Sequence, residues 1–323
     1  MLCLEAVIMW DREADGRLGV SRRGWLTSAA AAGGVAAASG GCRPAVAAFG
    51  AVTEDVDRPG ATRNTRFAVN VEMWFRGKSF LEKIELAAKY GYPAIEFWPW
   101  ENKPLAEAAA LLRDRGVAVS QFTAWPFGKV LNNPASDHAD FRKKIEQACD
   151  VADQLDCSLF TVVIGDNIDG ISKADMHAAA IRGLRLVAPI CEARKKTIII
   201  EPMNPRNHPG HSLYGGADAV AICRAVGSSS VKINWDLYHM QIVDGDLCLK
   251  MREAWDYIGY LQLADNPGRH EPGTGEVNYT RVFQEIVSLK YAGFVGLECT
   301  PLQDDWSAAQ RIWQADNWTP AAG

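Results

Sequence analysis

Four short apolar segments in the second half of the chain each carry an oxygen-bearing side chain at or near the end. The segments are 197–201, 231–236, 258–265 and 294–298, and the side chains are Glu201, Asp236, Gln262 and Glu298. Apolar runs of this length predict buried strands. The carboxyl ends of parallel, neighbouring strands meet at one edge, which in a (β/α)₈ barrel is the mouth where chemistry takes place. The pattern therefore favours a barrel whose mouth carries a ring of oxygen ligands.

The rest of the chain from Phe67 onward alternates between short apolar runs and amphipathic segments. Further strands are predicted at 67–71, 94–98, 117–125 and 159–165, and helices at 79–90, 104–115, 136–155, 173–195, 216–226, 246–255 and 279–290. No G-x-G-x-x-G motif follows the first strand, which disfavours a doubly wound dinucleotide-binding sheet. Eight strands with intervening helices predict a (β/α)₈ TIM barrel over residues 67–305, followed by a C-terminal tail at 306–323.

The first part of the chain has the character of an export signal. Arg22 and Arg23 precede a weakly apolar Ala/Gly stretch at 27–41 and an A-x-A site within 45–48. This order is typical of a bacterial twin-arginine signal, so we expect a signal region at 1–48, a linker at 49–66 and a periplasmic location. A disordered Ala-rich tail is the alternative, and a lipid anchor at Cys42 is disfavoured by Ser39 three residues earlier. The apolar stretch is too short and glycine-rich to span a membrane.

Composition excludes some classes of partner. The net charge is −5 and the pI is about 5.7, with no basic face, so nucleic acid is not an expected partner. The eight cysteines are scattered without a C-x-x-C pair, which argues against a disulfide framework or a zinc ribbon and for folding in a reducing compartment. A small molecule is the expected ligand, and a homo-oligomer stays open.

The four strand-end side chains form a hard set of ligands, with three carboxylates and one amide oxygen. Such a set suits Mg²⁺ or Mn²⁺ better than zinc. One acidic residue at a strand end is more often a helix cap or half of a surface ion pair. The same arrangement on four consecutive strands favours a metal site formed by Glu201, Asp236, Gln262 and Glu298. Asp265 is a competing carboxylate, but its place at a loop start better fits capping of backbone N–H groups.

Two further side chains border the predicted mouth. Arg269 lies in a loop rich in Pro and Gly (266–276) and offers a planar fork that can grip a carboxylate or an enediolate oxygen. His239 opens the loop that leaves the strand of Asp236 and can donate to a substrate oxygen. We predict both as substrate-binding residues, against a surface arginine and a structural histidine. His208 and His211 are expected to shape the loop after the fifth strand.

Several stretches together carry a family resemblance. They are EPMN (201–204), PGHSL (209–213), DLYHMQIVDGDL (236–247), QLADNPGRHEPGTGEVNY (262–279) and GLE (296–298). With them the chain, from about Phe67 to Pro301, resembles the hydroxypyruvate isomerase family within the xylose isomerase-like barrel superfamily. The resemblance implies a metal bound by Glu201, Asp236, Gln262 and Glu298, with Glu201 and Glu298 as the acid/base pair. Related ketose epimerases carry His where Gln262 stands. The weaker match of the first half leaves the substrate-facing residues there variable, including Trp74, Phe97, Trp98 and Trp125.

The activity that the resemblance implies is the interconversion of hydroxypyruvate and 2-hydroxy-3-oxopropanoate (tartronate semialdehyde) through an enediolate. A ketose 3-epimerase or another sugar isomerase on the same barrel is the nearest alternative. An endonuclease of the superfamily would need several zinc ions, more histidines than the six present and a basic face. An exported sugar-binding barrel without catalysis is the least favoured reading, because both glutamates and the whole ligand set are present.

Overall fold

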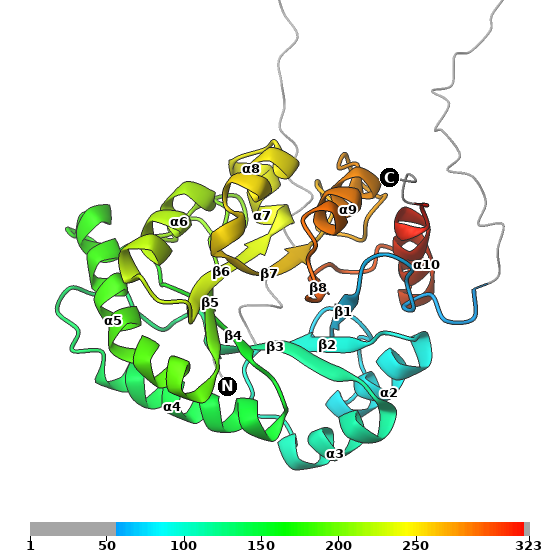
Figure 1. The fold of residues 1–323 in the computed structure, drawn as a ribbon, viewed down its shortest axis with the longest axis horizontal. Helices are drawn as coiled ribbons and strands as arrows, with labels where there is room; N and C mark the ends of the chain where they lie inside the picture. The colour runs from blue at the N-terminus through cyan, green and yellow to red at the C-terminus, as the bar shows by residue number, and fades with distance from the viewer. Residues whose placement is uncertain (1–55, 320–323) are drawn as a thin grey trace, which may run out of the picture. The chain divides into compact units, whose positions relative to one another are not determined.

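The computed structural model describes residues 56–319, which contain a closed barrel of eight parallel strands (Figure 1). The strands are β1 (Phe67–Asn70), β2 (Ala94–Phe97), β3 (Ala118–Trp125), β4 (Leu159–Val162), β5 (Thr197–Ile200), β6 (Val231–Asp236), β7 (Ile258–Leu263) and β8 (Val295–Leu297). They neighbour one another in chain order, and β1 pairs with β8 to close the ring. The predicted TIM barrel is confirmed.

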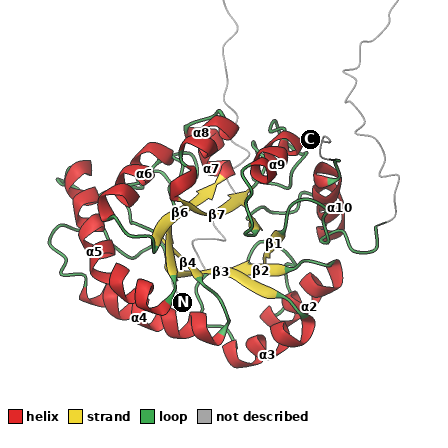
Figure 2. Cartoon of the chain, viewed as in Figure 1, coloured by secondary structure: helices red, strands yellow, loops and turns green. Residues whose placement is uncertain are grey.

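Helices surround the ring of strands (Figure 2). They are α2 (Phe80–Tyr90), α3 (Leu105–Arg115), α4 (Ala139–Gln154), α5 (Lys173–Arg194), α6 (Gly215–Val226), α7 (Leu237–Val243), α8 (Leu247–Glu253), α9 (Tyr279–Ser288) and α10 (Asp305–Asp316), with a 3₁₀ turn η2 (Trp255–Tyr257) before β7. Within residues 56–319, none of the helices combines the length and the apolar character that crossing a bilayer requires.

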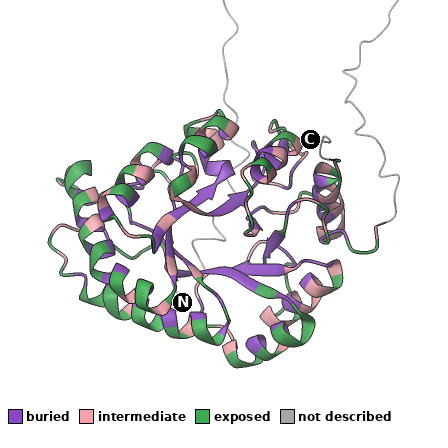
Figure 3. Ribbon diagram, viewed as in Figure 1, coloured by how far each residue is buried: buried purple, intermediate pink, exposed green. Residues whose placement is uncertain are grey.

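Local sequence explains why these elements form. Strand residues are covered on both faces, as in Ile198, Ile199 and Ile200 of β5, which are fully buried; this is why parallel strands consist of continuous apolar runs. Figure 3 shows the buried strands at the centre and the exposed helix faces outside. Ser79 and Glu82 form a reciprocal capping box at the start of α2, and Gly91 ends that helix in the left-handed region. The six cysteines in the described part of the chain are free, in keeping with the absence of a predicted disulfide framework.

The segment after β6 differs from the prediction. We expected a loop beginning at His239, but α7 starts at Leu237, directly after the strand, and His239 lies within this helix. Asp236 is the N-cap residue, and its Oδ1 accepts a hydrogen bond from Tyr238 N at 2.9 Å. Because the side chain that ends the strand also starts the helix, His239 is held one turn away from Asp236 on the same rigid element.

The last helix lies in the segment that we expected to be a tail. Asp304 caps α10 through Ser307 N, and the buried face of α10 repeats at helical spacing with Ala308, Ala309 and Ile312. These two signals were present in the sequence, and α10 is the helix that follows β8. The predicted signal region, including Cys42, lies outside the described residues, as does the linker up to residue 55.

The chain entering the barrel is fixed to the end of α10. Asp316 is fully buried and its Oδ2 accepts hydrogen bonds from Asn64 N at 2.8 Å and Thr65 N at 2.9 Å. Its Oδ1 accepts a third from Thr65 Oγ1 at 2.7 Å. This one carboxylate therefore joins segments that are 251 residues apart in the sequence.

Replacing Asp316 by Ala should lower the free energy of unfolding by about 1–3 kcal/mol, because the buried donors of Asn64 and Thr65 lose their acceptor. Urea unfolding followed by circular dichroism measures the change. Gln314→Ala, on the exposed face of the same helix, is the matched control. A loss for Asp316→Ala no larger than that of the control would contradict this role.

Candidate active site at the carboxyl end of the barrel

Three of the four predicted metal ligands converge at the barrel mouth. Glu201 directly follows β5, Asp236 ends β6 and Glu298 directly follows β8. One donor atom from each of these carboxylates and one from His239 on α7 all lie within 4.8 Å of one another, and all four residues are buried. The closed barrel therefore brings together side chains that are up to 97 residues apart, because parallel strands end at the same edge.

The carboxylates crowd negative charge into a buried place. Burial raises the pKa of Glu201 well above its usual range, and the charges of Glu298 and Asp236 raise it further. Burial also raises the pKa of Asp236 to about 8, with a further contribution from Glu298. Three buried carboxylates whose oxygens lie this close together could hold a metal ion, which would offset their negative charge.

Arg269 supplies positive charge at the same point. Its Nη2 lies 2.6 Å from Glu298 Oε2 and 3.4 Å from Asp236 Oδ2. The guanidinium carbon is 5.2 Å from the centre of the Tyr238 ring. Arg269 Nε is buried and has no hydrogen-bond partner within the described part of the chain, so one donor of the fork is unsatisfied.

The loop that carries Arg269 is organised by Asp265. Asp265 Oδ2 accepts hydrogen bonds from the backbone N–H groups of Gly273 and Gly275, both at 2.9 Å, and Oδ1 accepts from Val277 N at 3.1 Å. A Cβ on Gly275 would lie 2.6 Å from Asp265 Oδ1, so the close approach requires glycine. The predicted capping role of Asp265 is confirmed, and it fixes the loop around Arg269.

The hydrogen-bond geometry assigns the tautomer of His239. Asn204 Oδ1 accepts from the backbone N–H groups of Arg206 and Asn207, so Asn204 Nδ2 is the group that donates to His239 Nδ1, at 2.6 Å. Nδ1 is then an acceptor and the proton resides on Nε2. Burial lowers the pKa of His239 well below its usual value, so the ring is neutral. Nε2, 3.4 Å from Asp236 Oδ2, is therefore a donor that faces the carboxylates.

The fourth predicted ligand, Gln262, lies inside β7 in register with Asp236. Its Nε2 donates to Glu96 Oε1 at 2.8 Å, and its Oε1 accepts a hydrogen bond from Asn234 Nδ2. An amide oxygen has two lone pairs, so this oxygen keeps one for a further partner. Gln262 thus connects the mouth to a polar layer inside the barrel.

Glu96, at the centre of that layer, was missed by the sequence analysis. It is fully buried, and burial raises its pKa to about 7, with the charge of Glu298 adding to the effect. The available signal was one carboxylate inside the apolar strand AIEF, where it follows Ile95 and precedes Phe97. A charge in the middle of a strand buried on both faces requires hydrogen-bond partners from other strands.

Of the four aromatic residues expected to face the substrate, one contacts the site. Trp98 Nε1 donates to Glu298 Oε1 at 3.1 Å. Trp74 and Phe97 are fully buried and Trp125 is 6% exposed; each packs edge-on or stacked against other aromatic rings. For these three residues an influence on the choice of substrate stays a prediction.

Phe127, which the sequence analysis did not select, covers part of the mouth. Its ring stacks on His208, with ring centres 4.8 Å apart and an interplanar angle of 8°, although the residue is 44% exposed. The His208 ring in turn lies 5.4 Å from that of His239. His211 hydrogen-bonds to Asp166 at 3.2 Å, in keeping with a role in shaping the loop after β5.

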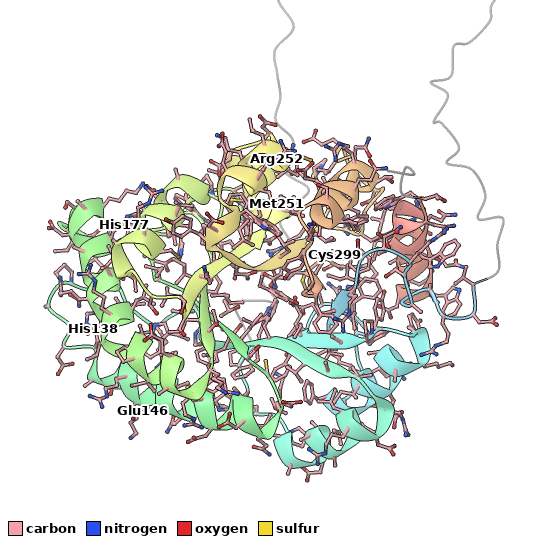
Figure 4. The ribbon with its side chains drawn as sticks, in the orientation of Figure 1. His138, Glu146, His177, Met251, Arg252 and Cys299 are labelled. Carbon is pink, nitrogen blue, oxygen red and sulfur yellow. The ribbon has the colours of Figure 1, made fainter. Side chains whose placement is uncertain are left out.

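Two other histidines, on the α4 and α5 side of the barrel, form hydrogen bonds to backbone carbonyl groups of loops (Figure 4). His138 Nε2 hydrogen-bonds to the carbonyl oxygen of Leu131 at 3.0 Å, and His177 Nε2 to that of Ser212 at 2.8 Å. Among the described residues, His239 is the one histidine in the group of potential ligands at the mouth. This composition does not fit a site for several zinc ions.

Comparison with known proteins identifies relatives with a consistent activity. A family model described as xylose isomerase-like TIM barrel matches residues 84–316. The 2-oxo-tetronate isomerase of Cupriavidus necator is 35% identical, over 73% of this chain and 93% of its own. The hydroxypyruvate isomerase of Escherichia coli is 32% identical with the same coverage.

Solved structures share the architecture. A protein from Brucella melitensis described as an AP endonuclease of family 2 has a TM-score of 0.73 and 28% identity, covering 79% of this chain and all of the other. A D-psicose 3-epimerase from Clostridium cellulolyticum superposes with a TM-score of 0.62 at 19% identity, covering 78% of this chain and 96% of the other, which shows a common fold alone.

In the presence of a chelator, the melting temperature should fall as the pH rises from about 5 to 8. The pKa of Asp236 is raised in the folded protein to about 8. The unfolded chain then binds fewer protons than the folded one above pH 4, and stability is lost as the pH rises towards the folded-state pKa. Asp236→Asn keeps the helix cap and removes the charge, so it should melt at least about 2 °C above the wild type at pH 8 and depend less on pH.

Asp169→Asn, at an exposed aspartate, is the matched control and should follow the wild-type curve. An Asp236→Asn protein that follows the wild-type curve as closely as the control would show that this carboxylate is not under electrostatic strain.

Proposed function

The chain belongs to the hydroxypyruvate isomerase family of xylose isomerase-like TIM barrels and is an isomerase, and from this we propose that it interconverts hydroxypyruvate and 2-hydroxy-3-oxopropanoate through an enediolate. The observation that carries the proposal is the convergence of Glu201, which follows β5, and Glu298, which follows β8, with Asp236 and Arg269. Two glutamates that face one small space can exchange protons with neighbouring carbons of one substrate.

We propose that the reaction depends on a divalent cation, Mg²⁺ or Mn²⁺. Glu201, Asp236, Gln262 and Glu298 would hold it, since their oxygens are hard donors at the ends of neighbouring strands. When bound, such a cation stabilises negative charge that develops on the carbonyl and hydroxyl oxygens of the substrate.

The proton transfers are assigned to the two glutamates. One of them removes a proton from the hydroxymethyl carbon of hydroxypyruvate, and the other delivers a proton to the adjacent carbon, while the hydroxyl proton moves to the former carbonyl oxygen. Burial raises the pKa of Glu201 above its usual range, which favours the form that carries a proton. Trp98 supports the pair by holding one oxygen of Glu298 through its indole N–H.

Two donors are available to bind the substrate. His239 is neutral and presents Nε2–H, and Arg269 keeps a free Nε–H beside the carboxylates. We propose that they hold the oxyanion or the carboxylate of the substrate, so that the charge that forms during proton transfer meets fixed donors.

The name of the Cupriavidus necator relative favours one alternative substrate, a four-carbon 2-oxo acid. Isomerisation of 2-oxo-tetronate would use the same glutamates and requires room for one more hydroxymethyl group. Ketose 3-epimerisation remains the alternative with a larger substrate. Export by the twin-arginine route stays a proposal that rests on residues 1–48.

Incubation with hydroxypyruvate in D₂O and Mn²⁺, quenched with chelator and followed by ¹H NMR, should show conversion with deuterium at the carbon that receives the proton. The parallel substrates are 2-oxo-tetronate and D-fructose, each with and without prior removal of metal. Conversion of fructose alone would replace the proposed activity by epimerisation, and turnover that persists after metal removal would exclude the metal dependence.

Glu298→Gln and Glu201→Gln should each lower turnover by about 10²–10⁴-fold, because each removes one of the two proton-transfer groups. Metal content must be measured on the same samples, since both residues are also proposed ligands. Glu107→Gln, on the exposed face of α3, is the control with unchanged turnover. Near wild-type turnover of Glu298→Gln with metal bound would refute the acid/base assignment.

A further inference from the structure

The carboxylate of Glu96 is the centre of a hydrogen-bond network that joins four strands of the barrel. Glu96 Oε1 accepts from Asn70 Nδ2 at 2.9 Å and from Gln262 Nε2 at 2.8 Å. Oε2 accepts from Tyr260 OH at 2.8 Å and from Gln121 Nε2 at 3.3 Å. The donors come from β1, β3 and β7, and Glu96 itself from β2. Every lone-pair direction of this buried carboxylate therefore has a partner.

The barrel makes room for this group. A Cβ at Gly296 of β8 would lie 2.3 Å from Glu96 Oε2 and 2.7 Å from its carboxyl carbon, so no other residue fits there without displacing Glu96. A fully buried carboxylate is costly compared with an apolar residue of the same size, even when it is well bonded. Its presence beneath the mouth, with a strand position left empty for it, points to a task besides filling space.

We relate that task to the orientation of the Gln262 amide, that is, to which of its two atoms, Oε1 or Nε2, faces which partner. A glutamine side chain can present its oxygen or its nitrogen in nearly the same place, and a metal ion accepts only the oxygen. Here Nε2 faces Glu96 Oε1, and Oε1 faces Asn234 Nδ2 on β6, the strand that ends in Asp236. Reversing the amide would set two oxygens against each other on one side and two nitrogens on the other.

The orientation does not depend on the protonation state of Glu96. Glu96 Oε1 receives N–H donors from both Asn70 and Gln262, which leaves no position for a proton on that oxygen. A proton on the carboxyl group would reside on Oε2, where Tyr260 OH can accept it. In either state the atom that faces Gln262 is an acceptor only.

We propose that Glu96 is a positioning residue, which holds the Gln262 amide with its nitrogen inward so that its oxygen is the end offered to the metal. This rests on the proposed function, in which Gln262 is a metal ligand. Glu96 acts through Gln262 and does not touch the substrate or the ion.

Two substitutions at position 96 separate orientation from charge. Glu96→Gln removes the charge but still offers an oxygen to Asn70 and Gln262. Its own nitrogen then faces Tyr260 OH and Gln121, and the Gln121 amide can turn its oxygen towards that nitrogen. This variant should keep the Mn²⁺ dissociation constant within about threefold of wild type. Glu96→Met keeps the volume but offers only a weak sulfur acceptor, and it should weaken Mn²⁺ binding by about 10–100-fold, as is typical when the partner that orients a ligand is lost.

The dissociation constant is measured from the electron paramagnetic resonance signal of free Mn²⁺, without substrate or turnover. Tyr260→Phe is the matched control, because it removes one donor to Glu96 Oε2 and leaves Gln262 untouched. It should bind Mn²⁺ as the wild type does. If Glu96→Gln and Glu96→Met weakened Mn²⁺ binding equally, the negative charge of Glu96 and not its orienting role would matter, and the proposal would be wrong. A Mn²⁺ dissociation constant of Glu96→Met equal to that of Tyr260→Phe would show that Glu96 has no effect on the metal.

Gln262→Leu distinguishes the failure of this proposal from the failure of the proposed function. If Gln262→Leu binds Mn²⁺ as the wild type does, Gln262 is not a ligand, and both its assignment in the proposed function and the role of Glu96 fall. If it binds weakly while Glu96→Met does not, the role of Glu96 alone falls.

A measurement on the wild type covers the case in which Glu96→Met does not fold. In protein labelled with ¹⁵N,¹³C-glutamine, the Gln262 side chain is identified by its absence in Gln262→Leu. Addition of Mg²⁺ should shift its carboxamide carbon while both Nε2 protons stay protected from exchange. Rapid exchange of those protons would contradict the inward orientation.

Discussion

The repulsion between buried carboxylates is the constraint around which the barrel mouth is built. Glu201, Asp236 and Glu298 are placed by three different strands, so no local rearrangement can relieve their proximity while the barrel stays closed. The surroundings respond with positive charge and oriented donors. Arg269 contacts two of the carboxylates and a neutral His239 presents its N–H to them. A bound cation would reduce the repulsion between these carboxylates, and the donors of Arg269 and His239 would stabilise negative charge that develops on a substrate.

A second layer of polar side chains lies beneath the mouth and restricts the positions of the mouth residues. Side-chain hydrogen bonds through Glu96, Gln121 and Tyr260 join β2, β3 and β7, and Gln262 on β7 also accepts from Asn234 on β6, the strand that ends in Asp236. Thr161 extends this layer to β4 through Gln121 Oε1 at 2.9 Å. Side chains inside a barrel usually pack as apolar layers. Here fixed hydrogen-bond directions replace part of that packing and leave little freedom for the residues above.

The sequence predicted the barrel and placed three of the four predicted metal ligands at its mouth. Both predictions follow from the periodicity of the strands. A side chain at the end of a buried parallel strand can only lie at the mouth, so Glu201, Asp236 and Glu298 were placed without knowledge of contacts. The direct start of α7 was missed, since Asp236 had been assigned one role and also serves as a helix cap. Glu96 and Phe127 were missed for a different reason. Their positions depend on partners more than 25 residues away, as with Gln262 for Glu96 and His208 for Phe127, and no local pattern encodes such pairs.

The contact between Thr65 and Asp316 has a consequence for the order of events during synthesis. The two residues are separated by 251 positions, so this contact cannot form until α10 has left the ribosome. Earlier parts of the barrel can assemble as they emerge, and Gly60 N can already donate to Tyr90 O at 2.8 Å, but the contact with Asp316 forms only when the last helix arrives. The segment before β1 is therefore held at two points that become available at different stages of synthesis, first by the α2–β2 turn and last by α10.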